Sequence, residues 1–247
     1  MQPEIGKADC MRKVVRVVLI SFTIPVTAAN LTASSRLTVD QVLQHMNEAN
    51  QRLEDLQADF VQIKEMALFD DRMLSRGKFY FRNPDKLVLD THSPEHQQLI
   101  INYNHVWLHY PELKQVHELS LKQTKGLSAL FVGFGGSVKA IREQFTVKIE
   151  DTAVDKNGKN SYTLSLVPLE GTPAASPALG LDRMLLTVSE GKWYPVRTQI
   201  VQKNGDRTIL EYSNHIDNLR FSESRFTFNP PAGTQVIDHT SESGVAQ

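Results

Sequence analysis

The chain has 247 residues, of which 40% are hydrophobic and 22% are charged, which is the usage of an ordinary globular protein. This composition excludes a long disordered chain and a polytopic membrane protein. Since 27 basic residues stand against 28 acidic ones, the formal net charge of −1 supplies no positive field to gather nucleic acid, and we expect no nucleic-acid partner. The length fits one or two compact domains, and because no linker divides the chain we predict one.

Residues 1–29 have the pattern of a secretory signal peptide. Arg12, Lys13 and Arg16 come before an apolar run that ends in small residues. The run holds about ten residues, whereas roughly 20 are needed to span a bilayer, so we expect a cleaved leader and not a membrane anchor. The sequence therefore predicts export.

The leader also sets the expected boundaries of the mature chain. We expect cleavage after Ala28 or Ala29, and Met11 is an alternative start of translation because basic residues follow it directly. A flexible processed N-terminus is predicted over 30–37, followed by a single folded domain over 38–240.

One amphipathic helix is predicted at the start of this domain. Thr38 and Gln41 have the spacing of a capping box, and apolar residues recur at helical period after them. We therefore expect a helix over Val39–Arg52 that packs one face on a core.

From residue 58 onward, short runs with alternating or β-branched residues are separated by turn residues about every ten positions. Asn157-Gly158 and Asn204-Gly205 are hairpin signals, and Pro84-Asp85 separates two runs. About eleven antiparallel strands are predicted from this spacing, near 58–66, 73–82, 86–91, 97–101, 105–110, 115–119, 145–151, 161–167, 183–189, 193–202 and 207–218, and 226–228 could add an edge.

A sheet of this width curls into a barrel or half-barrel, and it encloses more volume than its own side chains easily fill. Two segments interrupt the strand pattern. The first, 126–136, is too apolar for a plain loop, so we expect a short helix on the apolar interior. The second, 168–180, combines prolines and glycines with small residues, so we expect it to be exposed and mobile.

Motifs for enzymatic chemistry are missing from the sequence, which has no nucleophile elbow, phosphate-binding glycine loop or dinucleotide fingerprint. Five of the eight histidines lie between His92 and His117. His105 and His109 share a strand face about 13 Å apart, too far for one metal ion. His92 and His96, with Glu95 between them, could form a weak surface site, but solvated histidines are favoured, and we predict neither a metal site nor an enzyme.

Apolar side chains arranged on predicted strands remain as the candidate functional surface. Phe79 and Phe81 alternate on one strand, Leu87 and Leu89 on the next, and Trp107 lies nearby. These residues could line a ligand cavity or fill an ordinary core, and periodicity alone favours the filled core.

The order of several short motifs resembles that of the LolA family of periplasmic lipoprotein carriers. None of the motifs is specific alone, but together with the leader they span almost the whole mature chain. They are Ala58-x-Phe60-x-Gln62, the run from Gly77 to Pro84, Ser93-Pro94 followed by Val106-Trp107 and Pro111, and Phe226-x-Phe228-x-Pro230-Pro231-x-Gly233.

The resemblance implies a mainly β fold, namely a strongly curved, incomplete antiparallel barrel with helices covering its open side. It implies a periplasmic carrier that shields the acyl chains of lipoproteins, receives them from an ATP-driven (ABC-type) transporter in the inner membrane and delivers them to an outer-membrane acceptor. At roughly 0.8 kcal/mol per methylene, such chains cannot cross water unshielded. The implied cavity residues are Phe60, Phe79, Phe81, Leu87, Leu89 and Trp107, and the implied lid residues are Leu127, Leu130, Phe131 and Phe134.

Two departures from the family pattern concern the lid and the rim. In the family an arginine directly precedes the proline and holds the lid shut, whereas here Asn83 has that place and Arg82 comes one residue earlier. A shift of one residue on a strand reverses the face, so Arg82 is a latch candidate only if a bulge restores its direction. The other departure is His109, which stands where a tyrosine is expected.

Three functions follow as hypotheses. The first is a lipoprotein carrier that binds no cofactor and is most simply a monomer. The second is a periplasmic sensor or shuttle for another lipidic cargo, and the third is a metal-dependent enzyme built on the histidines.

Overall fold

The computed structural model describes residues 36–240 except 122–129, 136–137, 156–157 and 178. The predicted signal peptide and residues 30–35 of the predicted N-terminus lie outside the described residues. From Leu37 onward the chain forms one compact unit. Within the described residues, no helix has the length and apolar character needed to cross a membrane.

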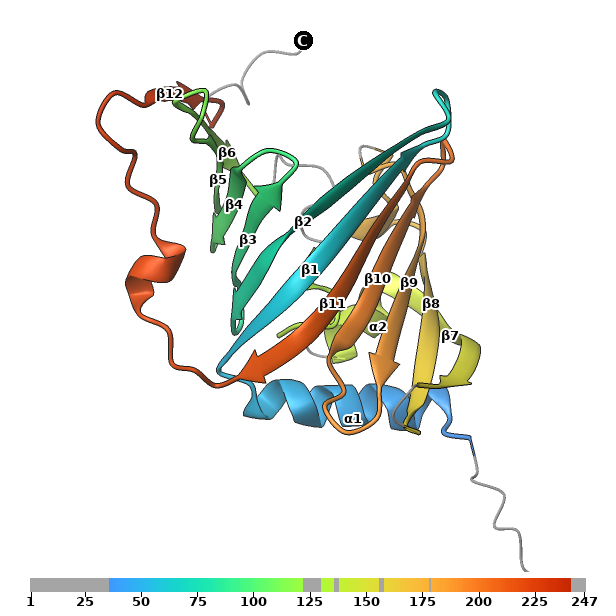
Figure 1. Ribbon diagram of the computed structural model, residues 1–247. Coiled ribbons are helices and arrows are strands. Elements are labelled where there is room, and N and C mark those ends of the chain that lie inside the picture. The colour runs from blue at the N-terminus through green and yellow to red at the C-terminus, as the bar shows by residue number, and fades with distance from the viewer. Residues whose placement is uncertain (1–35, 122–129, 136–137, 156–157, 178, 241–247) are drawn as a thin grey trace, which may run out of the picture. The chain divides into compact units, whose positions relative to one another are not determined.

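In the described part of the chain, twelve strands form one sheet, with helices α1 (Val39–Arg52) and α2 (Val138–Gln144) beside it (Figure 1). The strand order is β12-β6-β5-β4-β3-β2-β1-β11-β10-β9-β8-β7. Short 3-10 helices, η2 (Pro173–Ala175) and η3 (Glu223–Phe226), lie in connections. The strands are β1 (Asp55–Met66), β2 (Asp71–Arg82), β3 (Lys86–Ser93), β4 (Gln97–Asn102), β5 (His105–Tyr110), β6 (Gln115–Ser120), β7 (Phe145–Val154), β8 (Asn160–Pro168), β9 (Leu181–Ser189), β10 (Pro195–Gln202), β11 (Arg207–Asp217) and β12 (Gln235–Asp238).

Helix α1 begins and ends where the sequence predicts. The Thr38 side chain accepts a hydrogen bond from the backbone N–H of Gln41, and the Gln41 side chain accepts one from the Thr38 N–H, which completes the capping box. Val42, Leu43 and Met46 are buried on one face of the helix. Because a helix of this length is marginal alone in water, burial of this face stabilises it.

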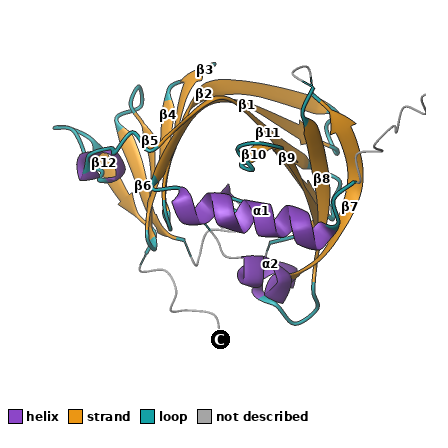
Figure 2. Ribbon diagram, turned by 90° about the horizontal axis from the view of Figure 1, so that it is seen from below, coloured by secondary structure: helices purple, strands orange, loops and turns teal. Residues whose placement is uncertain are grey.

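The sheet curls around an apolar interior and does not close in the described part of the chain, where β12 and β7 are its edges. Figure 2 shows α1 lying across the open side of the arch. Two clusters of buried side chains fill the concave face, one containing Phe79 and Phe81 and the other containing Tyr162 and Leu164. The predicted incomplete barrel covered by helices is confirmed.

A third cluster lies on the convex face, beneath residues 218–234, which we call the C-terminal strap. Phe226 of the strap is fully buried against a group that includes Tyr80. The buried carboxylate of Asp55 accepts a hydrogen bond of 2.8 Å from the backbone N–H of Phe221. The strap therefore covers apolar side chains that an isolated sheet would expose on its outer surface.

The last strand differs from the prediction in position and direction. Residues 226–228 form no strand, because Phe226 ends η3 and turns inward. The edge strand is instead β12, which pairs in parallel with β6. The strap crosses the convex face before β12 begins, so no hairpin signal marks this pairing in the sequence.

One of the two connections that interrupt the strands corrects a prediction. Of the segment 126–136, Leu130 and Phe131 have 3-10 helical conformation and residues 132–135 form turns, whereas 126–129 and 136 lie outside the described residues. The segment 168–180 is not simply exposed, since Ala174 is 5% exposed and Leu179 packs on the second cluster. Its small residues let the backbone lie against the interior.

Gly77 gives a direct test of the sheet's close packing. A Cβ atom at this position would overlap the backbone carbonyl of Asp90 on β3, beside a register shift between β2 and β3. We expect Gly77→Ala to lower the free energy of unfolding by about 1–3 kcal/mol, because one of the two backbones must move. Urea unfolding measures this change.

The matched control for this test is Ser75→Ala, two residues away on the same strand and also partly buried. It already carries a Cβ atom, so the free energy of unfolding should change by less than about 0.5 kcal/mol. Equal stability of Gly77→Ala and Ser75→Ala would contradict the packing described for β2 and β3.

Candidate functional site: a cavity in the concave face

A cavity of about 530 Å³ lies between the concave face of the sheet and the segments that cover it. This volume falls within the roughly 300–1,000 Å³ of pockets that hold small molecules. Strands on both sides of the arch contribute to it, together with residues of the 130–135 turns and of η2. The lining residues are Phe60, Gln62, Lys64, Leu89, Thr91, Gln97, Leu99, Val106, Leu108, Tyr110, Leu119, Leu130, Val132, Gln144, Phe145, Pro173, Ala174, Leu179, Leu181, Ile200, Gln202 and Thr208.

The lining changes from apolar to polar along the strands. On β1 the cavity is lined first by Phe60, then by Gln62, then by Lys64. The same order holds on β3, where Leu89 precedes Thr91, and on β10, where a glutamine follows Ile200. Because β1 starts where α1 ends, the polar residues lie toward the end of the sheet remote from α1.

This gradient gives the cavity an amphipathic character. Lys64 is the only Asp, Glu, Lys or Arg among the described lining residues, and it lies at the polar end. Its ammonium can remain in water while the apolar residues enclose hydrocarbon. The arrangement fits an amphiphile whose chain lies inside and whose polar end lies at the rim.

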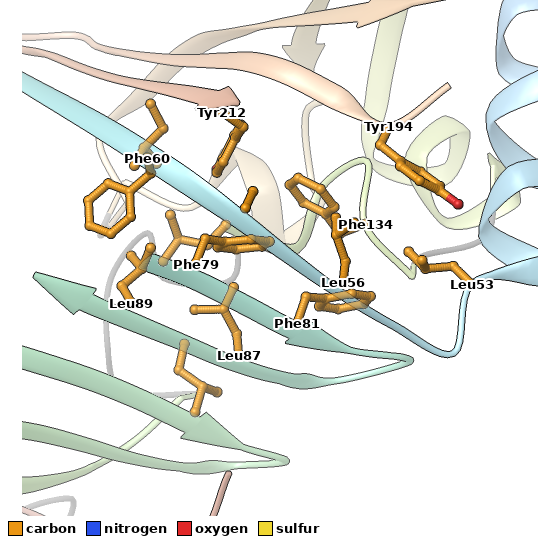
Figure 3. Packing of buried hydrophobic residues seen from close by; sticks show 14 of the residues in the cluster. Leu53, Leu56, Phe60, Phe79, Phe81, Leu87, Leu89, Phe134, Tyr194 and Tyr212 are labelled. Carbon is orange, nitrogen blue, oxygen red and sulfur yellow. The ribbon is translucent and has the colours of Figure 1, made fainter. Parts of the chain in front are cut away.

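The predicted cavity residues divide into three groups. Phe60 and Leu89 line the cavity. Phe79, Phe81 and Leu87 face the same interior but are fully packed, with exposed fractions of 1%, 0% and 0% (Figure 3). Core and cavity, which the periodicity left as alternatives, therefore occupy successive parts of one concave face.

Trp107 corrects the prediction because it lies on the other side of the sheet. Its neighbours on β5, Val106 and Leu108, line the cavity, so the alternation of the strand points Trp107 outward. There it packs on the convex cluster, with its ring centroid 6.4 Å from that of Phe228 in the C-terminal strap.

The described lid residues, Leu130, Phe131 and Phe134, form an inserted plug. Phe134 is completely buried, and its ring centroid lies 4.9 Å from that of Phe79, 5.8 Å from that of Phe81 and 5.3 Å from that of Tyr212. Figure 3 shows Phe134 among these side chains. Leu130 lines the cavity beside this plug, whereas Leu127 lies outside the described residues.

Phe131 joins the same packing at the edge of the plug. It is partly buried, and its ring lies edge-on to Phe81 at a centroid distance of 6.3 Å. Burial of the neighbouring Tyr212 raises the pKa of its hydroxyl, so this tyrosine stays neutral at physiological pH. The inner end of the concave face is therefore aromatic and uncharged.

A family model described as the outer membrane lipoprotein carrier protein LolA matches residues 51–229. The chain belongs to the LolA family. This family comprises carrier proteins and is not an enzyme family. The match begins at the end of α1 and extends into the C-terminal strap, so it includes every strand that lines the cavity.

Two relatives agree with this assignment. The outer-membrane lipoprotein carrier protein of Methylococcus capsulatus is 26% identical over 183 residues, which cover 74% of this chain and 81% of that protein. That of Alcanivorax borkumensis is 25% identical over 187 residues, covering 76% and 83%. A conserved protein from Thermus thermophilus shares the fold, with a TM-score of 0.51, 14% identity and coverage of 81% and 98%.

Arg82, the latch candidate of this LolA-family chain, faces the convex side. Its guanidinium donates a 2.6 Å hydrogen bond to the Glu223 carboxylate and another to the backbone carbonyl of Phe221. It also lies 5.0 Å above the centre of the Phe226 ring. No bulge turns Arg82 inward within the described β2, so it holds the C-terminal strap and not the lid.

Glu223 completes this contact between the strap and the sheet. The hydrogen bond that the Lys86 ammonium donates, together with nearby Arg82, lowers the pKa of the Glu223 carboxyl. The carboxylate is thereby charged throughout the neutral range, and two cations from β2 and β3 meet one anion of the strap.

Asn83 occupies the place of the family latch and makes inward contacts of its own. Its amide donates hydrogen bonds to the carbonyls of Asn50, at 3.1 Å, and Leu53, at 3.0 Å, both at the C-terminal end of α1. The amide of Asn50 in turn donates a 3.4 Å hydrogen bond to the carbonyl of Gly133. Asn83 therefore positions α1, and α1 contacts the plug.

The polar contact to the plug is weak by its geometry. The Asn50–Gly133 hydrogen bond is long, and Oδ1 of Asn50 is buried without a hydrogen-bond partner among the described residues. An unpaired buried oxygen costs free energy, so the polar contact of Asn50 adds little to the attachment of the plug. Aromatic packing of Phe134 is therefore the main contact that keeps the plug in place.

Several lining residues were not predicted. Leu99, Leu108 and Ile200 follow the alternation of their strands, so their inward direction could be inferred once the strands are known. Ala174 and Leu179 could not be found this way, because proline and small residues around them indicate an exposed loop.

Variants of the adjacent residues Arg82 and Asn83 distinguish contacts on the convex face from contacts at the end of α1. We expect Asn83→Ala to lower the free energy of unfolding by about 1–3 kcal/mol and to speed the entry of a fluorescent apolar dye. The Leu53 carbonyl loses its side-chain donor, and the Asn50 carbonyl keeps only the 3.3 Å hydrogen bond from the Leu53 N–H. Stopped-flow dye binding and urea unfolding measure these effects.

Arg82→Leu should leave dye entry unchanged and instead free the C-terminal strap, seen as faster proteolysis within 218–234. Faster dye entry in Arg82→Leu, with no change in Asn83→Ala, would show that the latch lies at Arg82 after all.

Proposed function

We propose that this protein is a periplasmic carrier that holds the acyl chains of lipoproteins in its cavity and moves them from the inner to the outer membrane. The graded lining of the cavity is the observation that carries this proposal. An apolar inner region matches acyl chains, and a polar rim around Lys64 matches the peptide to which the chains are attached. The LolA family membership supports the cargo class.

The physical need for a closed cavity supports the same function. Each methylene that leaves a membrane for water costs roughly 0.8 kcal/mol, so an exposed acyl chain holds its lipoprotein on the membrane. A concave face covered by α1 and by a movable aromatic plug can replace the membrane as the apolar environment. Release to an acceptor then needs only a small rearrangement of the plug.

The proposed partners follow from this cycle. Acylated lipoproteins are the cargo, an ABC-type transporter of the inner membrane loads them, and an outer-membrane acceptor receives them. We propose that the carrier acts as a monomer, exported by the signal peptide at 1–29, and that it catalyses no reaction.

Adjacent residues on β10 allow a matched test of the cargo. Ile200 lines the cavity, and Val201 points to the opposite face, where it pairs with Arg183 and Arg207. We expect Ile200→Glu to reduce co-purified acylated polypeptides about tenfold or more, because a carboxylate in the cavity opposes hydrocarbon. Val201→Glu should retain them. Mass spectrometry of protein from a native periplasmic extract measures both.

Leu108→Glu, on the opposite wall of the cavity, should repeat the loss, and circular dichroism of each variant checks that it is folded. Free lipid without acylated polypeptides would contradict the lipoprotein cargo and favour a lipid shuttle or sensor. Equal loss in Ile200→Glu and Val201→Glu would contradict the assignment of the cavity.

A further inference from the structure

A group of three potential metal ligands lies on the convex face, outside the cavity. Asp90, His92 and His96 each present a ligand atom, and these atoms all lie within 4.8 Å of one another. Nε2 of His96 lies 3.0 Å from Oδ1 of Asp90, and Nδ1 of His92 lies 3.9 Å from the same oxygen. We propose that these three side chains bind a Zn²⁺ ion.

The sheet itself brings the three residues together. Asp90 and His92 are two apart on β3 and therefore share a face, opposite to Leu89 and Thr91, which line the cavity. The turn after β3 returns the chain antiparallel, with Asp90 paired to Gln98. Continuing that register by two residues sets His96 beside His92, and their ring centroids are 5.8 Å apart.

The distances suit a metal ion after a small movement of side chains. Zn²⁺ binds imidazole nitrogen and carboxylate oxygen at about 2.0–2.2 Å, so ligands in a tetrahedral arrangement lie roughly 3.3 Å apart. Asp90 and His96 already have about this separation. His92 is 53% exposed and can rotate toward them without disturbing the core.

A second layer of contacts orients the carboxylate. The amide of Gln98 donates a 3.2 Å hydrogen bond to Oδ1 of Asp90, and its Oε1 lies 3.3 Å from Nδ1 of His109. His109 is 6% exposed and packs on Phe228 of the C-terminal strap, with ring centroids 4.8 Å apart. Metal sites are commonly supported by such hydrogen-bonded partners, which hold a ligand in its binding orientation.

The ligand set selects the class of metal. Two imidazoles and one carboxylate suit Zn²⁺ and its neighbours among the transition metals, whereas Ca²⁺ and Mg²⁺ prefer oxygen ligands throughout. Three protein ligands leave a fourth position for water or for a group of a partner. The site therefore differs from a closed structural zinc centre with four protein ligands.

The position of the site connects it to the rim of the cavity. Thr91 and Gln97 are register partners on the inner faces of the same two strands, and both line the cavity at its polar end. A Zn²⁺ ion on the outer face would join β3 to His96, the residue directly before β4, next to this pair. Metal binding would thereby fix the spacing of the two strands at the rim.

This inference departs from the sequence analysis, which favoured solvated histidines. The distance argument against a shared metal ion still holds for His105 and His109, because they lie four residues apart along β5. Sequence spacing alone did not predict that the turn after β3 brings His96 beside Asp90.

Zn²⁺ titration of untagged protein, stripped with a chelator and competed against a chromogenic zinc indicator, tests the proposal. We expect one Zn²⁺ per chain, an affinity at least tenfold lower in His92→Ala and His96→Ala, and a loss of about tenfold in Gln98→Ala, which removes only the supporting hydrogen bond. His45→Ala, at a partly exposed histidine of α1, should bind as wild type.

The temperature of unfolding gives an independent measure. Zn²⁺ should raise Tm in wild type and in His45→Ala but not in the double variant His92→Ala/His96→Ala, because only the folded ligand set binds the ion. Without Zn²⁺ all three proteins should unfold at similar temperatures, since these side chains are partly exposed. Absence of binding in wild type, or unchanged binding in the double variant, would overturn the proposal.

Discussion

The concave apolar face of an unclosed sheet must be covered, and the rest of the structure follows from how this chain covers it. A closed barrel would bury that face against itself, whereas here β12 and β7 remain separate edges in the described part of the chain. Helix α1 and the ring of Phe134 fill the inner end, and the cavity remains at the other end. One part of the face is therefore a packed core, and another part lines the cavity.

Alternation along single strands lets the same strands serve both faces of the sheet. On β2, Phe81 packs under the plug while the next residue, Arg82, holds the C-terminal strap outside. On β5, Leu108 lines the cavity while Trp107 supports the outer cluster. The strap thus stabilises from outside the strands that carry the cavity, without narrowing the cavity itself.

Sequence patterns predicted the parts of this fold that depend on local chemistry. The capping box at Thr38 located α1, and two-residue alternation put Leu87 and Leu89 on one face of β3. The family resemblance then gave Phe60 and Leu89 as cavity residues, and both line the cavity. The patterns failed where contacts between distant parts of the chain determine the structure. Nothing near Gln235 indicates a parallel pairing with β6, and the direction of Trp107 needs the register of β5 to be known. The hydrogen bonds of Asn83 to the end of α1 were not predicted either, because they join residues about 30 positions apart in the sequence.

Site-specific photocross-linking in cells tests most directly whether the cavity carries acyl chains. A photoreactive amino acid at Leu108, inside the cavity, should form cross-links to lipoproteins, and the cross-linked material should lose its lipid label when the acyl chains are removed. The same amino acid at Val201, on the convex face, should not. Cross-links to lipoproteins from Val201 but none from Leu108 would contradict the account, because the cargo would then bind outside the cavity.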